Sequence, residues 1–442
     1  MEPTTPAPAR TLHALVLDGQ YCHALAAVRS MGRRGTIVTV ASHKERAQGF
    51  SSRHCITRLL APSPVTEPTA YADWLLETLR RGRFDATLCF EEATADILSQ
   101  NRERVQALTG CPMPPREVFL AASRKDRVTR FARQLGVPTP LTHEMARLED
   151  ASRLAATLRF PVIVKGVHSS GSQQVELVRE ASQFVATVER LAALRRDPSL
   201  PLPIVQECIE GQGYGLTALV RRGEPVAVFM HRRLGEHDVA HGVKLAHGAT
   251  GAMSVHEPEL LASGLSILQA LCWDGVAMVE FKRSVRDGKF YLIEVNPRFV
   301  GSLELAIAAG IDLPWLYLQL AAGRPIVGPN RYRVGLRYRW LISKNVADVF
   351  ENPLGYALGA LSLLRPGTKC DLSWRDPRPH WSQLRNAAWF VREYLRARGS
   401  RTRPESVQTQ AAPAAMPATP SPSLAVSGES AARDLLSTPH SP

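Results

Sequence analysis

Two glutamates in neighbouring apolar segments are the residues of this chain best placed to do chemistry. Glu280 lies in the run Gly-Val-Ala-Met-Val-Glu-Phe-Lys, and Glu294 lies in Phe-Tyr-Leu-Ile-Glu-Val-Asn-Pro-Arg. Both runs are rich in strand-forming residues, and Arg286, Asp287 and Gly288 between them indicate a turn. A carboxylate within a buried strand is costly unless a cation compensates it. Oxygen ligands of this kind suit Mg²⁺, which commonly arrives with phosphates.

The turn length decides whether the two glutamates share a face. A two-residue turn would place the carboxylates on opposite faces of the hairpin. A three-residue turn ending in a left-handed Gly288 would place Glu280 opposite Glu294 on one face, and glycine adopts that conformation readily. We therefore predict the three-residue turn and a face that also carries Asn296, with Arg298 just beyond. The alternative is an acidic pair on an edge strand facing water.

The bulk composition is that of a soluble globular protein with two or three domains. The chain has 442 residues, of which 45% are hydrophobic. It has no apolar run long enough to span a bilayer and no signal-peptide core at its start, so we expect a cytoplasmic protein. The seven cysteines are scattered without a Cys-x-x-Cys pair, and several lie in apolar runs (Cys89, Cys208 and Cys272). We expect reduced core thiols rather than disulfides or a zinc site.

The net charge of +13 limits the partners to three classes: an anionic small ligand, nucleic acid or an anionic membrane surface. The sequence contains no zinc-finger, homeodomain or RNP-type motif, so a nucleic-acid partner is not expected.

Alternating apolar and amphipathic segments predict an α/β domain over residues 11–118. Expected strands at 12–17, 36–41 and 86–90 alternate with helical stretches, which is the pattern of a doubly wound parallel sheet. No Gly-x-Gly-x-x-Gly follows the first strand, so dinucleotide binding is not supported.

The central part of the chain predicts further strands and helices. A single helix is expected over residues 116–136. A strand at 161–165 precedes a polar glycine loop at 166–173, and the glycine-rich 211–215 is expected to be a hairpin turn. Arg232 and Arg233 are either contacts to substrate or phosphate, or a plain surface pair.

The C-terminal part divides into a basic unit and a tail. In residues 329–398, four arginines lie at odd-numbered positions and would share one face of a strand. They are Arg331, Arg333, Arg337 and Arg339. Residues 379–398 combine arginines with aromatic residues. This pattern is typical of a helix packed on its own domain or, less often, of a helix on a membrane surface. Residues 1–10 and 399–442 are expected to be disordered, the second because Ala, Pro, Ser and Thr dominate it.

Four segments in this order resemble the ATP-grasp superfamily of carboxylate ligases, in the single-unit form similar to one half of the carbamoyl phosphate synthetase large chain. They cover roughly residues 120–325, and Asn-Pro-Arg-Phe-Val-Gly-Ser at 296–302 is the most specific piece. The resemblance implies an α/β and α+β architecture. A Rossmann-like domain at 11–118 would precede a two-lobed ATP-grasp domain at 119–328 and a small accessory unit at 329–398. The four segments are residues 123–127, 161–172, 205–211 and the pair 279–282 with 293–298.

The resemblance also implies roles by position. Lys165 would bind the α- and β-phosphates of ATP, with Lys125 supporting them from the other side. Arg298 would stabilise charge on the transferring phosphoryl group. Mg²⁺, with Mn²⁺ as an alternative, would be held by Glu280, Glu294 and Asn296. One further segment would cover the triphosphate, namely Ser169, Ser170, Gly171 and Ser172. Another would contact the adenosine, namely Glu207, Cys208, Ile209 and Glu210.

The implied function is an ATP- and Mg²⁺-dependent ligase. It would activate a substrate carboxylate as an acyl phosphate for attack by an amine, or by a thiol or other nucleophile, with ADP and phosphate as products. The expected partners are small-molecule carboxylates and amines; a homodimer and membrane contact are lesser options. The alternative is a non-catalytic nucleotide-binding module docked to a membrane surface or a partner.

Residues 236–250 depart from the family pattern, because histidines replace the expected small residues. The acid and the nucleophile therefore stay open. His237, Asp238, His241 and His247 could hold a transition metal only on a helix, which Gly242 and Gly248 disfavour.

Overall fold

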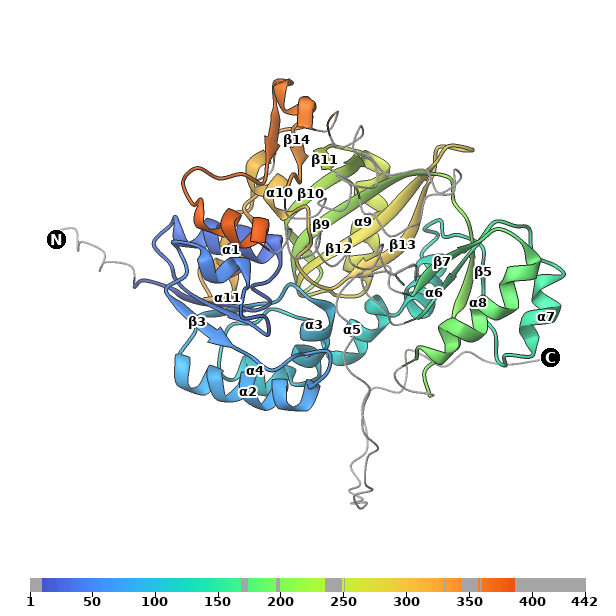
Figure 1. The fold of residues 1–442 in the computed structure, drawn as a ribbon, viewed down its shortest axis with the longest axis horizontal. Helices are drawn as coiled ribbons and strands as arrows, with labels where there is room; N and C mark the ends of the chain where they lie inside the picture. The colour runs from blue at the N-terminus through green and yellow to red at the C-terminus, as the bar shows by residue number, and fades with distance from the viewer. Residues whose placement is uncertain are drawn as a thin grey trace, which may run out of the picture. The chain divides into compact units, whose positions relative to one another are not determined.

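A computed structural model describes residues 10–167, 174–195, 199–234, 249, 251–329, 331–342, 357 and 360–385 (Figure 1). The strands form three sheets, all within the compact unit Met1–Glu405. In the described ranges no single helix is long and apolar enough for a bilayer span, although the bent pair Leu303–Ala309 and Leu313–Ala321 passes that test jointly. The His237–His247 cluster lies outside these ranges.

The first sheet is parallel, as predicted, with strand order β3-β2-β1-β4. Alternate residues of β1 enter different cores. Ala14 and Val16 pack with α1 and α11, whereas Leu15 and Leu17 pack with α2 and α3. The elements are β1 His13–Val16, α1 Cys22–Gly32, β2 Ile37–Ser42, η1 Gln48–Ser51, β3 Thr57–Leu60, α2 Pro68–Gly82, β4 Ala86–Leu88, α3 Glu92–Gln100 and α4 Arg102–Gln106.

The second sheet is antiparallel, in the order β5-β8-β6-β7. Phe184 and Leu191 of α8 pack on Val164 of β6 in its core. Lys165 is the last residue of β6, so it lies at the end of an inner strand, paired on both sides with β7 and β8. The elements are β5 Thr142–His143, α7 Asp150–Ala155, β6 Val162–Lys165, β7 Val175–Val178, α8 Ala181–Ala193 and β8 Ile204–Glu207.

The third sheet has seven strands, in the order β13-β12-β9-β10-β11-β14-β15. Its apolar face packs against α5, α6 and α9 through Phe281, Phe119 and Ile267. The strands are β9 Gly211–Arg221, β10 Glu224–Leu234, β11 Gly251–Ser254, β12 Gly275–Ser284, β13 Phe290–Asn296, β14 Arg337–Arg339 and β15 Thr368–Cys370. The helices are α5 Arg116–Ser123, α6 Lys125–Gln134, α9 Pro258–Ala270, α10 Leu303–Ala309, α11 Leu313–Ala321 and η3 Ser362–Leu364.

The prediction of one helix over residues 116–136 is wrong. Arg124 is extended, with φ −81° and ψ 121°, and separates α5 from α6. The break lets the Lys125 amide donate to the Val167 carbonyl at 3.1 Å instead of continuing a helix. A long-range hydrogen bond therefore overrides the local helical propensity, and it places Lys125 directly beside the residues that follow Lys165.

Three further expectations are corrected. The glycines at 211–215 lie inside β9 rather than in a turn. Glycine is needed at Gly211 and Gly215 because the backbone of Arg283 and the ring of His231 leave no room for a Cβ there. The basic strand is only Arg337–Arg339, since Gly335 has a left-handed φ of 82°. All seven cysteines are free thiols as expected, but Cys272 is exposed and not in the core.

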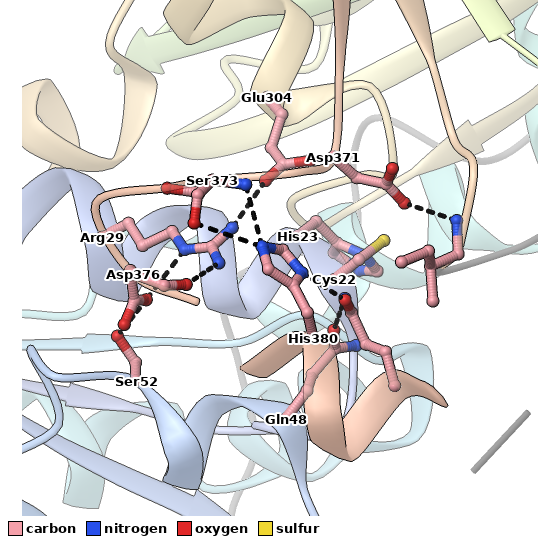
Figure 2. Close-up of polar contacts among 12 residues, drawn as sticks. Cys22, His23, Arg29, Gln48, Ser52, Glu304, Asp371, Ser373, Asp376 and His380 are labelled. Atoms are coloured by element: carbon pink, nitrogen blue, oxygen red, sulfur yellow. Dashed lines mark hydrogen bonds and ion pairs between the residues drawn. The ribbon is translucent and has the colours of Figure 1, made fainter. Parts of the chain in front are cut away.

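A buried polar network joins residues 371–385 to the first sheet and its helices (Figure 2). Arg29 of α1 donates to Asp376 at 2.9 Å and lies 3.7 Å from Glu304 of α10. Asp376 also accepts from the Ser52 hydroxyl at 2.8 Å and the Arg53 amide at 2.9 Å. This segment is therefore fixed to α1 by charged and neutral hydrogen bonds that are shielded from water.

Candidate nucleotide and metal site

Glu280 and Glu294 are direct partners across the β12–β13 pair, as predicted. The predicted turn length is wrong, however. The Ser284 amide donates to the Lys289 carbonyl at 2.9 Å, so four residues, 285–288, form the turn. Ile293 forms a bulge that adds one residue to β13 and restores the predicted register. Gly288 has the expected left-handed conformation, with φ 72°.

Asn296 lies on the same face as the two glutamates. Its amide nitrogen donates to Glu294 Oε1 at 2.9 Å, and its Oδ1 accepts from Arg298 Nη2 at 3.2 Å. Two carboxylates and one amide oxygen form an oxygen-only donor set, which fits Mg²⁺ or Mn²⁺. No group of three or more His, Cys, Asp or Glu side chains with metal-binding geometry occurs among the described residues. Glu280, Glu294 and Asn296 together could hold a divalent cation.

Cationic side chains from other elements compensate both glutamates. Arg233 Nη2 of β10 lies 2.6 Å from Glu280 Oε2, and Lys125 Nζ lies 3.6 Å from Glu294 Oε2. Burial would raise the pKa of Glu294, but Lys125, the Asn296 amide and Lys165 together hold this pKa below its usual range. The charged form of Glu294 is therefore favoured, which suits this carboxylate to bind a cation.

The structure brings Lys165 to the same place. Lys165 is only 7% exposed, and burial lowers its pKa to about 8 against the opposing effect of Glu294. Nearby Lys125 and Lys282 lower the pKa of Lys165 further, whereas Glu280 raises it. Three sheet strands and one helix thus contribute ionised groups to one cluster, which is suited to a ligand with several negative charges.

Lys282 is a member of this cluster that the sequence analysis did not identify. It follows Glu280 by two residues on β12 and therefore points to the same face. Its Nζ donates to the Ile209 carbonyl at 3.4 Å. Because side chains alternate along a strand, the spacing of two residues from Glu280 could have identified Lys282 in the sequence.

The segment from Glu207 to Glu210, including Cys208 and Ile209, connects β8 of the second sheet to β9 of the third. The Glu207 amide donates to the Leu141 carbonyl at 2.9 Å, and the Glu210 carbonyl accepts from the Val285 amide at 3.0 Å. The expected connector between two lobes is therefore present. The other predicted nucleotide segment, Ser169, Ser170, Gly171 and Ser172, lies outside the described residues.

Arg298 faces a second group of residues that the sequence analysis missed. Asp18 and Glu91 follow β1 and β4, the two strands at which the order of the first sheet reverses. Burial raises the pKa of Asp18 to about 6, against its hydrogen bonds and Arg298. Burial and Asp18 raise the pKa of Glu91 to about 7, and Arg298 again opposes the shift. Ligands of doubly wound sheets commonly bind at this reversal point, so two carboxylates next to Arg298 extend the site toward the first sheet.

The comparisons with known proteins agree with this geometry. Residues 122–302 match the ATP-grasp domain family. The chain is 27% identical over 239 residues to the carbamoyl phosphate synthase large chain of Thermomicrobium roseum, covering 53% of this chain and 21% of the relative. It is 22% identical over 211 residues to the N-terminal section of that large chain from Methanopyrus kandleri, covering 47% of this chain and 37% of the relative. The chain therefore spans well under half the length of these relatives.

Solved structures share the fold at low sequence identity. The biotin carboxylase–β-γ-ATP complex from Campylobacter jejuni aligns with a TM-score of 0.60 at 15% identity, covering 74% of each chain. The L-amino acid ligase from Bacillus licheniformis aligns with a TM-score of 0.55 at 18% identity, covering 71% of this chain and 75% of the ligase. Residues 122–302, which hold Lys125, Lys165, both glutamates and Asn296, therefore form an ATP-grasp domain within a mixed α/β fold.

Proposed function

We propose that this protein is an ATP- and Mg²⁺-dependent ligase that converts a substrate carboxylate into an acyl phosphate and joins it to an amine. The observation that carries the proposal is the paired Glu280 and Glu294, with Lys125 Nζ 3.6 Å from the second carboxylate and Lys165 within electrostatic reach. Such a cluster fits the triphosphate of ATP together with a divalent cation. An amine acceptor is preferred over a thiol because Glu91 would attract an ammonium group and not a neutral thiol. Asp18 supports Glu91 from within the protein, since it is 3% exposed and accepts from the amides of Phe90 and Glu91.

In the binding step, Lys125 and Lys165 contact the phosphates, while Glu280, Glu294 and Asn296 hold the metal. When bound, Mg²⁺ would neutralise negative charge on the phosphates. Arg233 and Lys125 compensate the two carboxylates, and we propose that both side chains turn toward phosphate oxygens when ATP binds. We propose that the adenosine lies against the connector formed by Glu207, Cys208, Ile209 and Glu210.

In the first chemical step, a substrate carboxylate oxygen forms a bond to the γ-phosphorus, and the bond from that phosphorus to the ADP oxygen breaks. Arg298 is held by the Phe299 carbonyl at 3.1 Å and by Asn296, so its guanidinium is oriented before reaction. We propose that it stabilises the charge that develops on the phosphoryl oxygens. The protein contributes position and electrostatics here and forms no covalent bond to substrate.

In the second step, the bound ammonium loses one proton to solvent and becomes the neutral amine. The amine nitrogen then forms a bond to the acyl carbon, the bond from carbon to the phosphate oxygen breaks, and the nitrogen loses its second proton. Glu91, with its pKa raised to about 7, is suited to accept that proton near neutral pH. Its position beside Arg298 supports an approach of the amine from the side of the first sheet. We further propose that the chain has three domains, at residues 11–118, 119–328 and 329–398. The first domain would provide the residues that bind the amine.

The decisive experiment is a phosphate-release screen of carboxylic acids crossed with amines, followed by mass detection of the adduct. Glu294→Gln should abolish turnover of any active pair, whereas Glu224→Gln, at the exposed start of β10, should not. Equal ADP formation by the wild type and Glu294→Gln would remove the mechanism. Binding of MgATP without turnover of any pair would favour the alternative of a non-catalytic nucleotide-binding module.

A further inference from the structure

Residues 360–385 expose an unusual number of large apolar side chains. Trp374 is 91% exposed and Trp381 is 74% exposed, although tryptophan is on average among the more buried residue types. Exposed apolar side chains that gather in one place mark an interaction site more often than isolated ones do. The others in this segment are Leu361, Leu364, Leu372 and Leu384.

The helical residues 378–385 have two different faces. The inward face is used already, because Gln383 is 6% exposed and donates to Gln48 of η1, and Ser382 bonds to Ser51 at 2.7 Å. Trp381 and Leu384 are three residues apart and both exposed, so they lie on the outward face. Contact with the first sheet therefore does not explain the exposed tryptophan.

All exposed charges of this segment are positive. The basic residues at 365, 369, 375, 378 and 385 are exposed. The two acidic residues, Asp371 and Asp376, are 3% and 2% exposed. Asp371 accepts from the amides of Leu341 and Ile342. Asp376 is held by Arg29, as Figure 2 shows. Residues 360–385, all of them described, thus present tryptophan and arginine without a compensating exposed carboxylate.

We propose that the outward face of helical residues 378–385, with Trp381, Leu384, Arg378 and Arg385, docks the protein onto an anionic phospholipid membrane surface together with the exposed Trp374 and Arg375 of the preceding turn. Tryptophan favours the interface between headgroups and acyl chains, and arginine extends its charge to the lipid phosphates. A second copy of the chain is a poorer occupant. A two-fold contact would place the same positive residues against each other without negative ones between them.

The test is co-sedimentation of the full chain with vesicles of phosphatidylglycerol and phosphatidylcholine, compared with vesicles of phosphatidylcholine alone. The wild type should bind the anionic vesicles only. The double substitution Trp374→Ala and Trp381→Ala leaves the net charge unchanged, yet it should weaken this binding roughly tenfold or more, since both side chains lose their apolar burial. The matched control is Val285→Ala with Val327→Ala, two apolar residues that are 75% and 93% exposed elsewhere, and it should bind like the wild type.

A second pair of variants tests the charge. Arg378→Gln with Arg385→Gln should weaken binding on the order of 30-fold, whereas Arg58→Gln with Arg104→Gln, exposed arginines of the N-terminal region, should change it far less. The melting temperature of each variant, with and without MgATP, checks that its fold is kept.

Three results would overturn the proposal. The first is no binding of the wild type to anionic vesicles. The second is equal binding by the tryptophan variant, which would mean that net charge alone attracts the protein. The third is a concentration-dependent dimer in sedimentation velocity that the tryptophan variant abolishes while vesicles bind neither protein, which would make this face a contact between copies.

Discussion

Lys125 Nζ lies 3.6 Å from Glu294 Oε2, although Lys125 begins helix α6 and Glu294 belongs to strand β13. The break at Arg124 creates this relationship, because it lets the Lys125 backbone bond to Val167 while the side chain reaches the sheet. A lysine paired with a carboxylate at this distance can exchange that partner for a phosphate group. The ionised cluster is thus preassembled, and the following predictions test it.

Replacing either glutamate of the pair should remove the response of the protein to metal and nucleotide together. Glu280→Gln and Glu294→Gln each keep the shape of the side chain but remove the charge that would hold Mg²⁺. We expect ATP turnover to fall by about 10²-fold or more, and the rise in melting temperature with MgATP to disappear. Thermal unfolding with ATP plus Mg²⁺, or with ATP plus a chelator, measures this response. Glu224→Gln is the control, and an unchanged MgATP shift in both variants would show that the pair does not hold the metal.

Binding of MgATP should be accompanied by proton uptake at pH 8. Lys165 has a pKa lowered to about 8 by burial, so about half of its amines are neutral at that pH. Phosphates beside the lysine stabilise its charged form and raise the pKa, and protons are therefore taken up. Titration calorimetry in two buffers with different ionisation enthalpies measures the number of protons. Lys165→Met should abolish the uptake and the exposed Lys369→Met should not; binding with no proton uptake by the wild type would contradict the prediction.

Glu91 should make the protein less stable as the pH rises. Burial raises its folded-state pKa from 4.5 to about 7, so between these values the folded protein holds more protons than the unfolded chain. Stability therefore falls as the pH increases through this window. From pH 5 to pH 8, the wild type should lose about 1–3 kcal/mol more than Glu91→Gln in urea unfolding. The exposed Glu103→Gln should follow the wild type, and parallel losses in all three proteins would refute the assignment.

Arg298 should matter for kcat more than for the KM of ATP, because the charge it meets develops only during phosphoryl transfer. We expect Arg298→Met to lower kcat by about 10²–10³-fold with a similar KM. Arg298→Lys should recover only part of the loss, since an ammonium group cannot reproduce the forked bonds to Phe299 and Asn296. Steady-state kinetics with an active acid and amine pair gives both constants. A large rise in KM with unchanged kcat would instead assign Arg298 to ground-state binding.

Asp376 should be essential for the attachment of residues 371–385 to α1. Its side chain is 2% exposed and neutralises Arg29. Asp376→Ala leaves the buried guanidinium with only the more distant Glu304, at 3.7 Å, and should lower the free energy of unfolding by about 3 kcal/mol. Urea denaturation measures this change, with the exposed Asp73→Ala as control. If both variants have the midpoint of the wild type, the network of Figure 2 does not contribute to stability.

The sequence by itself determined that Glu294 and Asn296 share one face, because side chains alternate with a period of two in a strand. The prediction that Glu280 joins them rested on a three-residue turn, which the structure does not have. The same local patterns predicted the parallel first sheet and the strand that ends in Lys165. They did not predict the four-residue turn and the Ile293 bulge. These two departures from the expected register cancel, so the glutamates face each other all the same.

Only the tertiary structure decided which cations meet these carboxylates. Arg233, Lys125 and Lys165 come from three different elements, and Asp18 and Glu91 approach Arg298 from another sheet. The spacing of apolar residues shows which face of a helix or strand is buried, but not which other element packs against that face. The break at Arg124 shows the same limit, because a hydrogen bond to the distant Val167 outweighed a helical pattern that continued without interruption in the sequence.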